Sequence, residues 1–127
     1  MSEVVLDASA LLALIRRERG ADAVASHLSD AAVSAVNIAE TYGRLLRDAF
    51  RPDELRRDIE ALGLDVRSFD PEQAFIAGEI EPATRPLGLS LGDRACLALA
   101  KSLGLPVLTG DRQWLKAKIG VDVRLFR

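Results

Sequence analysis

Cysteine and histidine are nearly absent from this sequence, which has one of each among 127 residues, Cys96 and His27. A single cysteine excludes an internal disulfide and a cysteine-based metal site. A solitary histidine cannot build a Ser/His/Asp catalytic site, and we expect His27 to lie on the surface of a short helix. A glycine-rich phosphate loop is also missing, because Gly92 and Gly110 are each followed by Asp-Arg instead of the required pattern.

Aromatic residues make up only 5% of the chain, whereas hydrophobic residues make up 49%. The apolar residues are mostly Ala, Leu and Val, a composition that excludes disorder and favours helices packed on a sheet over a β-sandwich. Residues 10–15 form an apolar run far too short to span a bilayer, and the acidic Glu3 and Asp7 do not fit a signal peptide. We therefore expect one domain over residues 1–127, without a membrane partner, in the reducing cytoplasm.

The chain also lacks the excess of basic residues that is typical of general nucleic-acid binders. Its 17 basic and 19 acidic residues give a net charge of −2. If four acids were neutralised by bound cations, 15 acids would remain against the 17 bases, and the surface charge would be about +2. Fourteen of the bases are arginine, whose planar fork suits phosphate. A polyanionic substrate is therefore compatible with the composition without being implied by it.

Short apolar segments alternate with longer helical patterns along the whole chain. The strand-like segments are residues 4–6, 32–34, 65–69, 106–109 and 121–125. The helical segments are residues 10–17, 22–28, 35–50, 52–62, 71 to about 84 with Pro82 bending or ending it earlier, about 90–103, and a helical turn at 112–118. This alternation predicts an α/β fold, a three-layer α/β/α sandwich with a mostly parallel sheet of four or five short strands.

Four acids stand where such a fold builds an active site: Asp7, Glu40, Asp93 and Asp111. Asp7 and Asp111 follow strands, Asp93 begins the helix before the second of those strands, and Glu40 lies on the helix after residues 32–34. We expect all four at the edge where the carboxyl ends of parallel strands meet. Four carboxylates there cannot all ionise without compensation, and all-oxygen ligands favour Mg²⁺ or Mn²⁺ over Zn²⁺. These ions can activate water and neutralise charge on a phosphodiester, so the pattern predicts metal-assisted hydrolysis.

Each acid also has a purely structural explanation. Asp7 could cap the helix that it precedes, and Asp93 has the spacing of a capping box. Asp111 could be a turn residue or a cap, and Glu40 could pair with Arg44 one turn later. Trp114 could stack on a base, although burial against the last strand is the favoured interpretation. What these explanations leave unaccounted for is the joint placement of the four acids.

Four motifs give the chain a resemblance to a known family: VVLDAS at the N-terminus, SAVNIAET around Glu40, LSLGDRACLALA at Asp93 and VLTGD at Asp111. Together they resemble a PIN-domain ribonuclease, specifically the VapC-type toxin of toxin–antitoxin pairs, over nearly the whole chain. The resemblance implies that Asp7, Glu40, Asp93 and Asp111 are the metal-binding catalytic acids. It further matches Ser9 and Thr109 to hydroxyl positions beside the first and last acids, and Asn37 to a polar position one turn before Glu40.

The resemblance also implies an activity, which is the cleavage of RNA with Mg²⁺ or Mn²⁺ to give a 5′-phosphate product. It further implies that the protein is a homodimer and that a small cognate antitoxin inhibits it. The apolar excess of residues 10–15 is consistent with a partner that covers this helix. Some relatives carry a further acid where this chain has Arg112, Gln113 and Trp114, so we expect Asp111 to serve alone and through water.

Three other classes of protein fit the sequence less well. A response-regulator receiver domain needs an acid pair after its first strand and a late lysine, and the chain shows neither. A haloacid-dehalogenase-type phosphatase needs a second Asp two residues after Asp7, where Ser9 stands. A catalytically inactive PIN-like module that binds RNA or protein is the remaining alternative, although such a module is expected to have lost at least one of the four acids.

Overall fold

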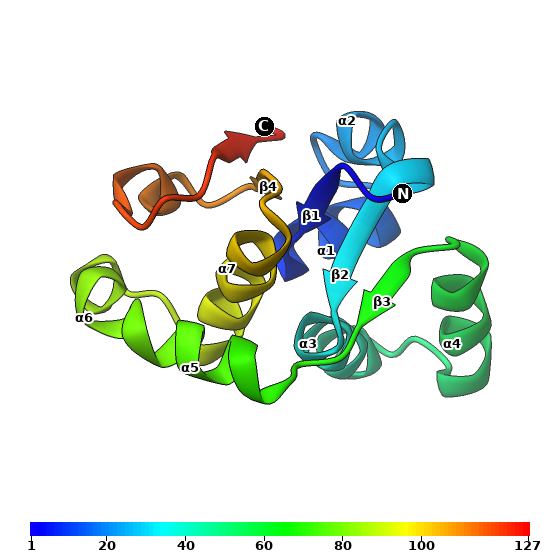
Figure 1. Cartoon of the computed structure of the whole chain (residues 1–127). Coiled ribbons are helices and arrows are strands. Elements are labelled where there is room, and N and C mark those ends of the chain that lie inside the picture. Colours follow the sequence, from blue (N-terminus) through cyan, green and yellow to red (C-terminus); the bar gives the residue numbers. More distant parts are fainter.

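The computed structural model describes all of residues 1–127 and contains a five-stranded sheet with helices on both faces (Figure 1). The strands are β1 (Val4–Leu6), β2 (Ala31–Ser34), β3 (Asp65–Arg67), β4 (Val107–Thr109) and β5 (Val123–Leu125). Their order in the sheet is β3-β2-β1-β4-β5, and every neighbouring pair is parallel. The predicted three-layer α/β/α fold is therefore confirmed, with a sheet that is parallel throughout.

Seven α-helices and three short 3₁₀ helices connect the strands. The α-helices are α1 (Ala8–Arg16), α2 (Ala21–Ala25), α3 (Ala35–Arg47), α4 (Pro52–Ala61), α5 (Pro71–Glu79), α6 (Glu81–Thr84) and α7 (Leu91–Leu103). The 3₁₀ helices are η1 (Leu28–Asp30), η2 (Arg85–Leu87) and η3 (Arg112–Lys116). None of these helices has the length and apolar character that a membrane crossing requires.

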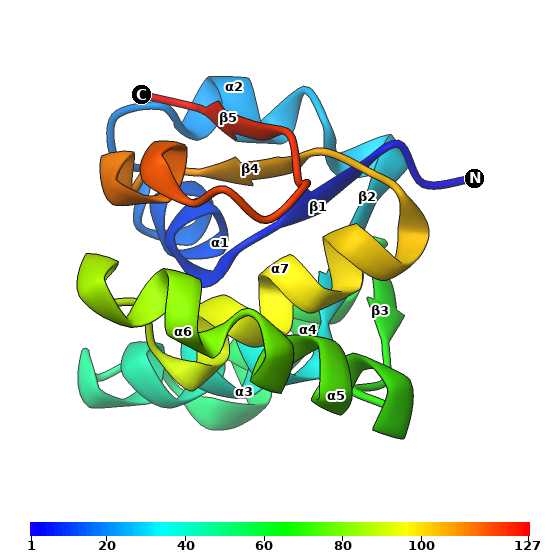
Figure 2. The ribbon, with the colours of Figure 1, turned by 60° about the vertical axis from the view of Figure 1, so that its left-hand side comes forward.

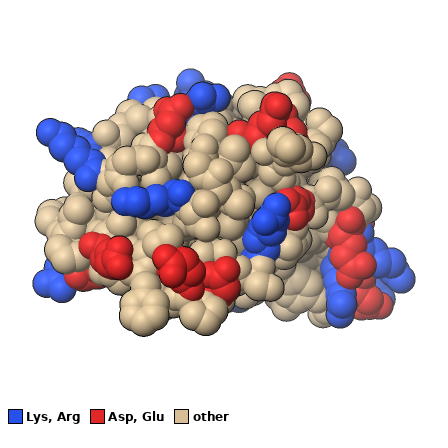
Figure 3. Space-filling model, viewed as in Figure 1, with Lys and Arg blue, Asp and Glu red and all other residues tan.

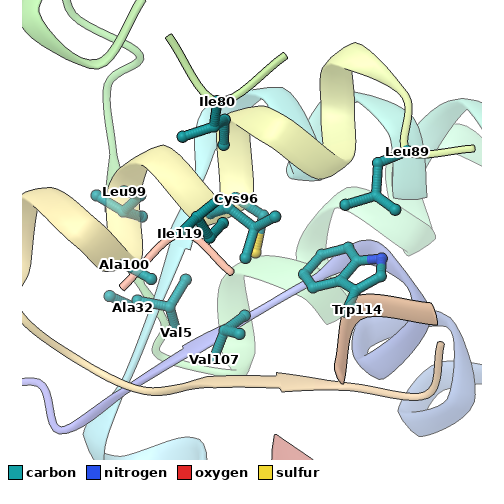
Figure 4. Packing of buried hydrophobic residues seen from close by; sticks show 11 residues of the cluster. Val5, Ala32, Ile80, Leu89, Cys96, Leu99, Ala100, Val107, Trp114 and Ile119 are labelled. Atoms are coloured by element: carbon teal, nitrogen blue, oxygen red, sulfur yellow. The ribbon is translucent and has the colours of Figure 1, made fainter. Parts of the chain in front are cut away.

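Alternation along the strands divides the core between the two faces of the sheet. Val5 points toward α7, where it packs with Cys96 and Trp114, as Figure 4 shows. Val4 and Leu6 point to the opposite face and pack against α1 and α2. Figure 2 shows the same division, with α1 and α2 on one side of the strands and α5, α6 and α7 on the other. The burial of Trp114 confirms the favoured interpretation of that residue.

The apolar side chains of α1 are covered mainly by other parts of the same chain. Leu11 packs with the sheet, while Leu12 contacts a separate cluster that includes Leu45 of α3 and Leu55 of α4. Leu11 and Leu12 are both buried, and the helix is thus apolar on two faces because it is sandwiched between the sheet and two other helices. The expectation that a partner must cover α1 therefore loses its motivation.

Several predicted boundaries were wrong by a few residues. The helix predicted for residues 35–50 ends at Arg47, and Ala49 adopts a left-handed conformation (φ 67°) that stops it. The expectation that Pro82 bends or ends the helix from Pro71 is confirmed, because the helix is divided into α5 and α6 and Pro82, in the first turn of α6, has no N–H to continue it. The strands predicted for residues 65–69 and 121–125 are shortened to three residues each.

Candidate active site at the carboxyl edge of the sheet

Asp7 lies at the centre of the site, between the end of β1 and the start of α1. Its carboxylate is 4% exposed and accepts three hydrogen bonds. Ser9 Oγ (2.7 Å) and the Ala10 amide (2.9 Å) donate to Oδ1, and Thr109 Oγ1 (2.6 Å) donates to Oδ2. Burial raises the pKa of Asp7 to about 6, even though the two hydroxyls act in the opposite direction. The charge of Asp93 raises the same pKa further, which places Asp93 nearby.

Ser9 and Thr109 also connect Asp7 to the loop after β4. The Gly110 amide donates to Ser9 Oγ (3.0 Å), and the Asp111 amide donates to Thr109 Oγ1 (3.0 Å). Each hydroxyl thus accepts a hydrogen bond from the β4 loop and donates one to Asp7, an arrangement that fixes both rotamers. Residues more than a hundred positions apart are held together at one edge of the sheet by this network.

Asp111 itself points away from this network. Its side chain is exposed, and Oδ1 accepts a hydrogen bond from the Gln113 amide (2.9 Å), so that Asp111 caps η3. The cap predicted as the structural alternative is therefore present. Asp111 stays at the same edge as Asp7, two residues beyond Thr109, and its carboxylate accepts its hydrogen bond within its own turn.

Asp93 forms the capping box that its spacing predicts. The Asp93 amide donates to Ser90 Oγ (3.2 Å), and the Ser90 amide donates to Asp93 Oδ2 (2.9 Å). Because α7 runs back across the sheet from the carboxyl edge, this first turn lies beside Asp7. The structural explanation of Asp93 is therefore confirmed, and the capping box uses one carboxylate oxygen and leaves the other available.

Glu40 extends from α3 onto the first turn of α7. Its Oε1 accepts a hydrogen bond from Asn37 Nδ2 (2.8 Å), which also donates to the carbonyl of Gly92 (3.0 Å). Glu40 makes no ion pair with Arg44, so its predicted structural alternative was wrong. The contact with Gly92 places the Glu40 carboxylate next to Asp93.

Cys96 is completely buried in α7, one turn after Asp93, with Sγ 3.7 Å from the carbonyl of Leu6. Burial raises the pKa of Cys96 well above its usual range, and the negative charges of Asp7, Asp93 and Glu40 raise it further.

No basic side chain neutralises this group of acids. Eight ion pairs occur in the molecule, and none includes any of the four predicted site acids. On the face shown in Figure 3, acidic and basic side chains are interspersed without a large region of one sign. The charge of the converging acids is therefore left for a ligand from outside the chain to balance.

The donor set fits a hard divalent cation such as Mg²⁺ or Mn²⁺, because every available ligand atom is an oxygen. The carboxylates do not form a finished cage, since no three His, Cys, Asp or Glu side chains are placed to hold an ion together. Asp7 and Asp93 are each engaged as helix caps. A cation bound here must therefore use their remaining oxygens, displace cap hydrogen bonds, or complete its ligands with water.

The sequence identified the acids but not the role of Gly92. A Cβ atom added to Gly92 would lie 2.5 Å from Cδ and 2.7 Å from Oε2 of Glu40. The only sequence signal was a glycine directly before Asp93. Its role could not be predicted from that signal, because the side chain that needs the space, Glu40, lies on a helix about fifty residues earlier.

The largest groove, about 860 Å³ between α3, α4 and β3, is lined by none of the four acids. His27 lies outside the site, beside Asp30.

Comparison with protein families matches the PIN domain over residues 4–120. Among solved structures, DNA-bound VapBC from Salmonella typhimurium matches with a TM-score of 0.78 and 18% identity over 100% of both chains. A toxin–antitoxin complex from Klebsiella pneumoniae matches with a TM-score of 0.75 and 15% identity over 98% of both chains. FitAcB from Neisseria gonorrhoeae has a TM-score of 0.70 and 24% identity, over 94% of this chain and 95% of the other. No curated protein matches the sequence.

Proposed function

The chain belongs to the PIN domain family, and we propose that it is a metal-dependent endoribonuclease, the toxin of a VapBC-type toxin–antitoxin pair. Relatives of the VapC kind are generally nucleases. The observation that carries the proposal is a geometric one: Asp7 follows β1, and Asn37 links Glu40 to the first turn of α7, the turn that holds Asp93, while none of these acids has a basic partner. Burial of the Asp7 carboxylate disfavours its ionised form, a cost that a bound cation would offset.

In this proposal Asp7, Glu40 and Asp93 hold Mg²⁺ or Mn²⁺, and Asp111 contributes through water. When bound, the cation supplies Lewis-acid chemistry, activating water and stabilising the charge that develops on the phosphodiester. Ser9 and Thr109 orient the Asp7 carboxylate through their hydroxyl hydrogen bonds. Because Asp111 is exposed at the rim, its carboxylate is accessible to a water molecule beside the substrate. The product then carries a 5′-phosphate.

We further propose a cognate antitoxin as partner and a homodimer as the assembly. The similarity to VapBC and other toxin–antitoxin complexes supports the antitoxin. Large apolar side chains remain exposed on the monomer, among them Phe75 (71%), Leu91 (58%) and Leu115 (54%). Leu91 lies only two residues before Asp93, so a partner that covered it would also restrict access to the site.

The proposal is tested by incubating purified protein with total cellular RNA in Mg²⁺ or Mn²⁺, with and without EDTA, and sequencing the new 5′ ends. We expect cleavage at defined positions, 5′-phosphate ends, and loss of cleavage in EDTA. Protein carrying Asp7→Asn, purified in parallel, reports any contaminating nuclease. Undiminished cleavage in EDTA would contradict the metal requirement. RNA binding without cleavage would favour the catalytically inactive module instead.

A further inference from the structure

Glu40 differs from the other converging acids in how it reaches the site. Asp7 and Asp93 are short side chains fixed as caps at the starts of their own helices. Glu40 lies in the second turn of α3 and must extend across to α7 with a longer, more flexible side chain. A ligand on such a side chain binds tightly only if something else restricts its conformation. The contacts that restrict Glu40 are therefore part of how the site is built.

We propose that Asn37 and Gly92 form a seat that fixes the Glu40 carboxylate on the first turn of α7, which makes Asn37 a positioning residue for the cation site. This inference rests on the proposed function, because it concerns the same site. The inference gives a role in the site to Asn37 and Gly92, which are uncharged and would not themselves bind the cation.

Asn37 is suited to the task by its burial and its two amide hydrogens. The residue is 1% exposed, and Nδ2 donates to Glu40 Oε1 (2.8 Å) and to the carbonyl of Gly92 (3.0 Å). These two acceptors fix the orientation of the amide, since its oxygen could not take the place of the nitrogen between them. One side chain thus joins α3, Glu40 and α7. Its own oxygen, Oδ1, is buried and has no donor.

A neutral donor is also the chemistry that a cation site requires here. Lys or Arg at position 37 would hold Glu40 but would neutralise it, and the positive charge would repel a divalent ion. Asn37 holds Oε1 without changing the charge of the carboxylate. Glu40 Oε2 accepts no hydrogen bond from the protein and stays available as a ligand.

Gly92 completes the seat by leaving room for the carboxylate. Its backbone is helical, so the glycine is not explained by a positive φ. The space is the reason, because a Cβ atom would overlap the position of the Glu40 carboxylate. Glycine weakens the first turn of a helix compared with alanine. At position 92, where the Glu40 carboxylate contacts α7, the chain therefore has glycine although alanine would favour the helix more.

The test is the affinity of the purified protein for Mn²⁺, measured by calorimetry without RNA. Asn37→Ala and Gly92→Ala should each weaken Mn²⁺ binding by about ten- to a hundred-fold, the range typical of residues that orient metal ligands. Gln73→Ala is the matched control. Gln73 lies on α5 and, like Asn37, is a buried amide that donates to a backbone carbonyl, that of Ser68 (3.1 Å). The control should bind Mn²⁺ like the wild type. If Asn37→Ala fails to fold, Asn37→Ser retains one donor and should show a smaller loss.

A double-mutant cycle with Glu40→Gln separates positioning from a general structural role. If Asn37 acts through Glu40, Asn37→Ala should weaken Mn²⁺ binding no further in a Glu40→Gln background. An equal loss in both backgrounds would overturn the inference, as would wild-type Mn²⁺ affinity in folded Asn37→Ala protein. A wild-type protein that binds no Mn²⁺ at all would overturn the proposed function as well, so the two failures are distinguishable.

Discussion

Asp7 combines two roles that the sequence presents as alternatives. It caps α1 through Oδ1, as a strand-end aspartate before a helix is expected to do. The same carboxylate is buried, and burial raises its pKa to about 6, although the hydrogen bonds from Thr109 and Ser9 act in the opposite direction. A cap exposed to solvent would lack this effect of burial.

The raised pKa of Asp7 predicts how stability depends on pH in the metal-free protein. The folded pKa of about 6 exceeds the ordinary value of 3.8, so the folded state binds the proton more tightly than the unfolded state does. This contribution is fully present below about pH 4 and is lost as the pH rises through about 6. The change amounts to about 3 kcal/mol, since one pKa unit corresponds to about 1.4 kcal/mol. Asp7→Asn should remove this slope.

The measurement is urea unfolding between pH 4 and pH 8 in the presence of EDTA. The matched control is Asp70→Asn, because Asp70 caps α5 through the Gln73 amide (2.8 Å) but lies outside the site. The control should keep the wild-type slope. A slope that persists in Asp7→Asn would assign the pH dependence to another group.

For individual residues, the position along the chain was easier to interpret from the sequence than the contacts of the side chain. The four acids were proposed as site residues from their positions, three after strands or at a helix start and Glu40 within a helix. The structural alternative for Glu40 was an ion pair with Arg44, because an i,i+4 pair is the local choice for a helical glutamate. The side chain instead turns to Asn37 and Gly92. This choice depends on where α7 lies, and α7 is remote in sequence.

At the scale of elements, the first turn of α7 carries the clearest local signal. Ser90→Ala removes the Oγ acceptor of the Asp93 amide and should lower the free energy of unfolding by about 1 kcal/mol. The Ser90 backbone amide still donates to the Asp93 carboxylate (2.9 Å), so Asp93 should keep its place. We therefore expect RNA cleavage within a few-fold of wild type. Chemical denaturation and a cleavage assay check the two parts. A folded Ser90→Ala protein without cleavage would show that the hydroxyl itself belongs to the site.

The element types were predictable and several ends were not. Pro82 was expected to bend or end its helix, and the division into α5 and α6 confirms this. The ends of β3 and β5 depend on how far the neighbouring strands β2 and β4 extend, because a strand continues only where it has a partner. The helix α1 was expected to pack on the sheet and in part on a partner chain. Its second face packs on α3 and α4, whose tertiary placement a local pattern does not specify.

At the scale of the whole molecule, the parallel sheet brings the candidate site residues to one edge. Alternating strands and helices predicted parallel strands, and parallel strands place all their carboxyl ends at one edge. The order β3-β2-β1-β4-β5 puts β1 in the centre, with Asp7 between the ends of β2 and β4. Strand order is set by the side toward which each crossover turns, and the sequence does not encode that in a local pattern.

The proposed partner is tested on the whole protein in cells. Expression of the chain alone should arrest growth, and co-expression of a small protein encoded beside it should relieve the arrest and yield a complex that purifies together. The exposed Phe75 and Leu91 give the physical reason, because a partner removes their apolar surface from water. Protein carrying Asp93→Asn should still form the complex. A monodisperse monomer at high concentration, with no neighbour-encoded protein able to suppress it, would contradict the partner proposal.

The central claim is that the acids at the carboxyl edge of the sheet perform metal-dependent RNA cleavage, and the rate of cleavage by Asp93→Asn tests it most directly. The side-chain oxygen of Asn can still accept the hydrogen bond of the Ser90 amide in the capping box, so the substitution removes a charge and little stability. We predict that cleavage in Mn²⁺ falls by orders of magnitude, because transition-state stabilisation worth several kcal/mol is lost. The variant should unfold at a temperature close to that of the metal-free wild type, and Asp70→Asn should cleave normally. Wild-type cleavage by Asp93→Asn would contradict the account.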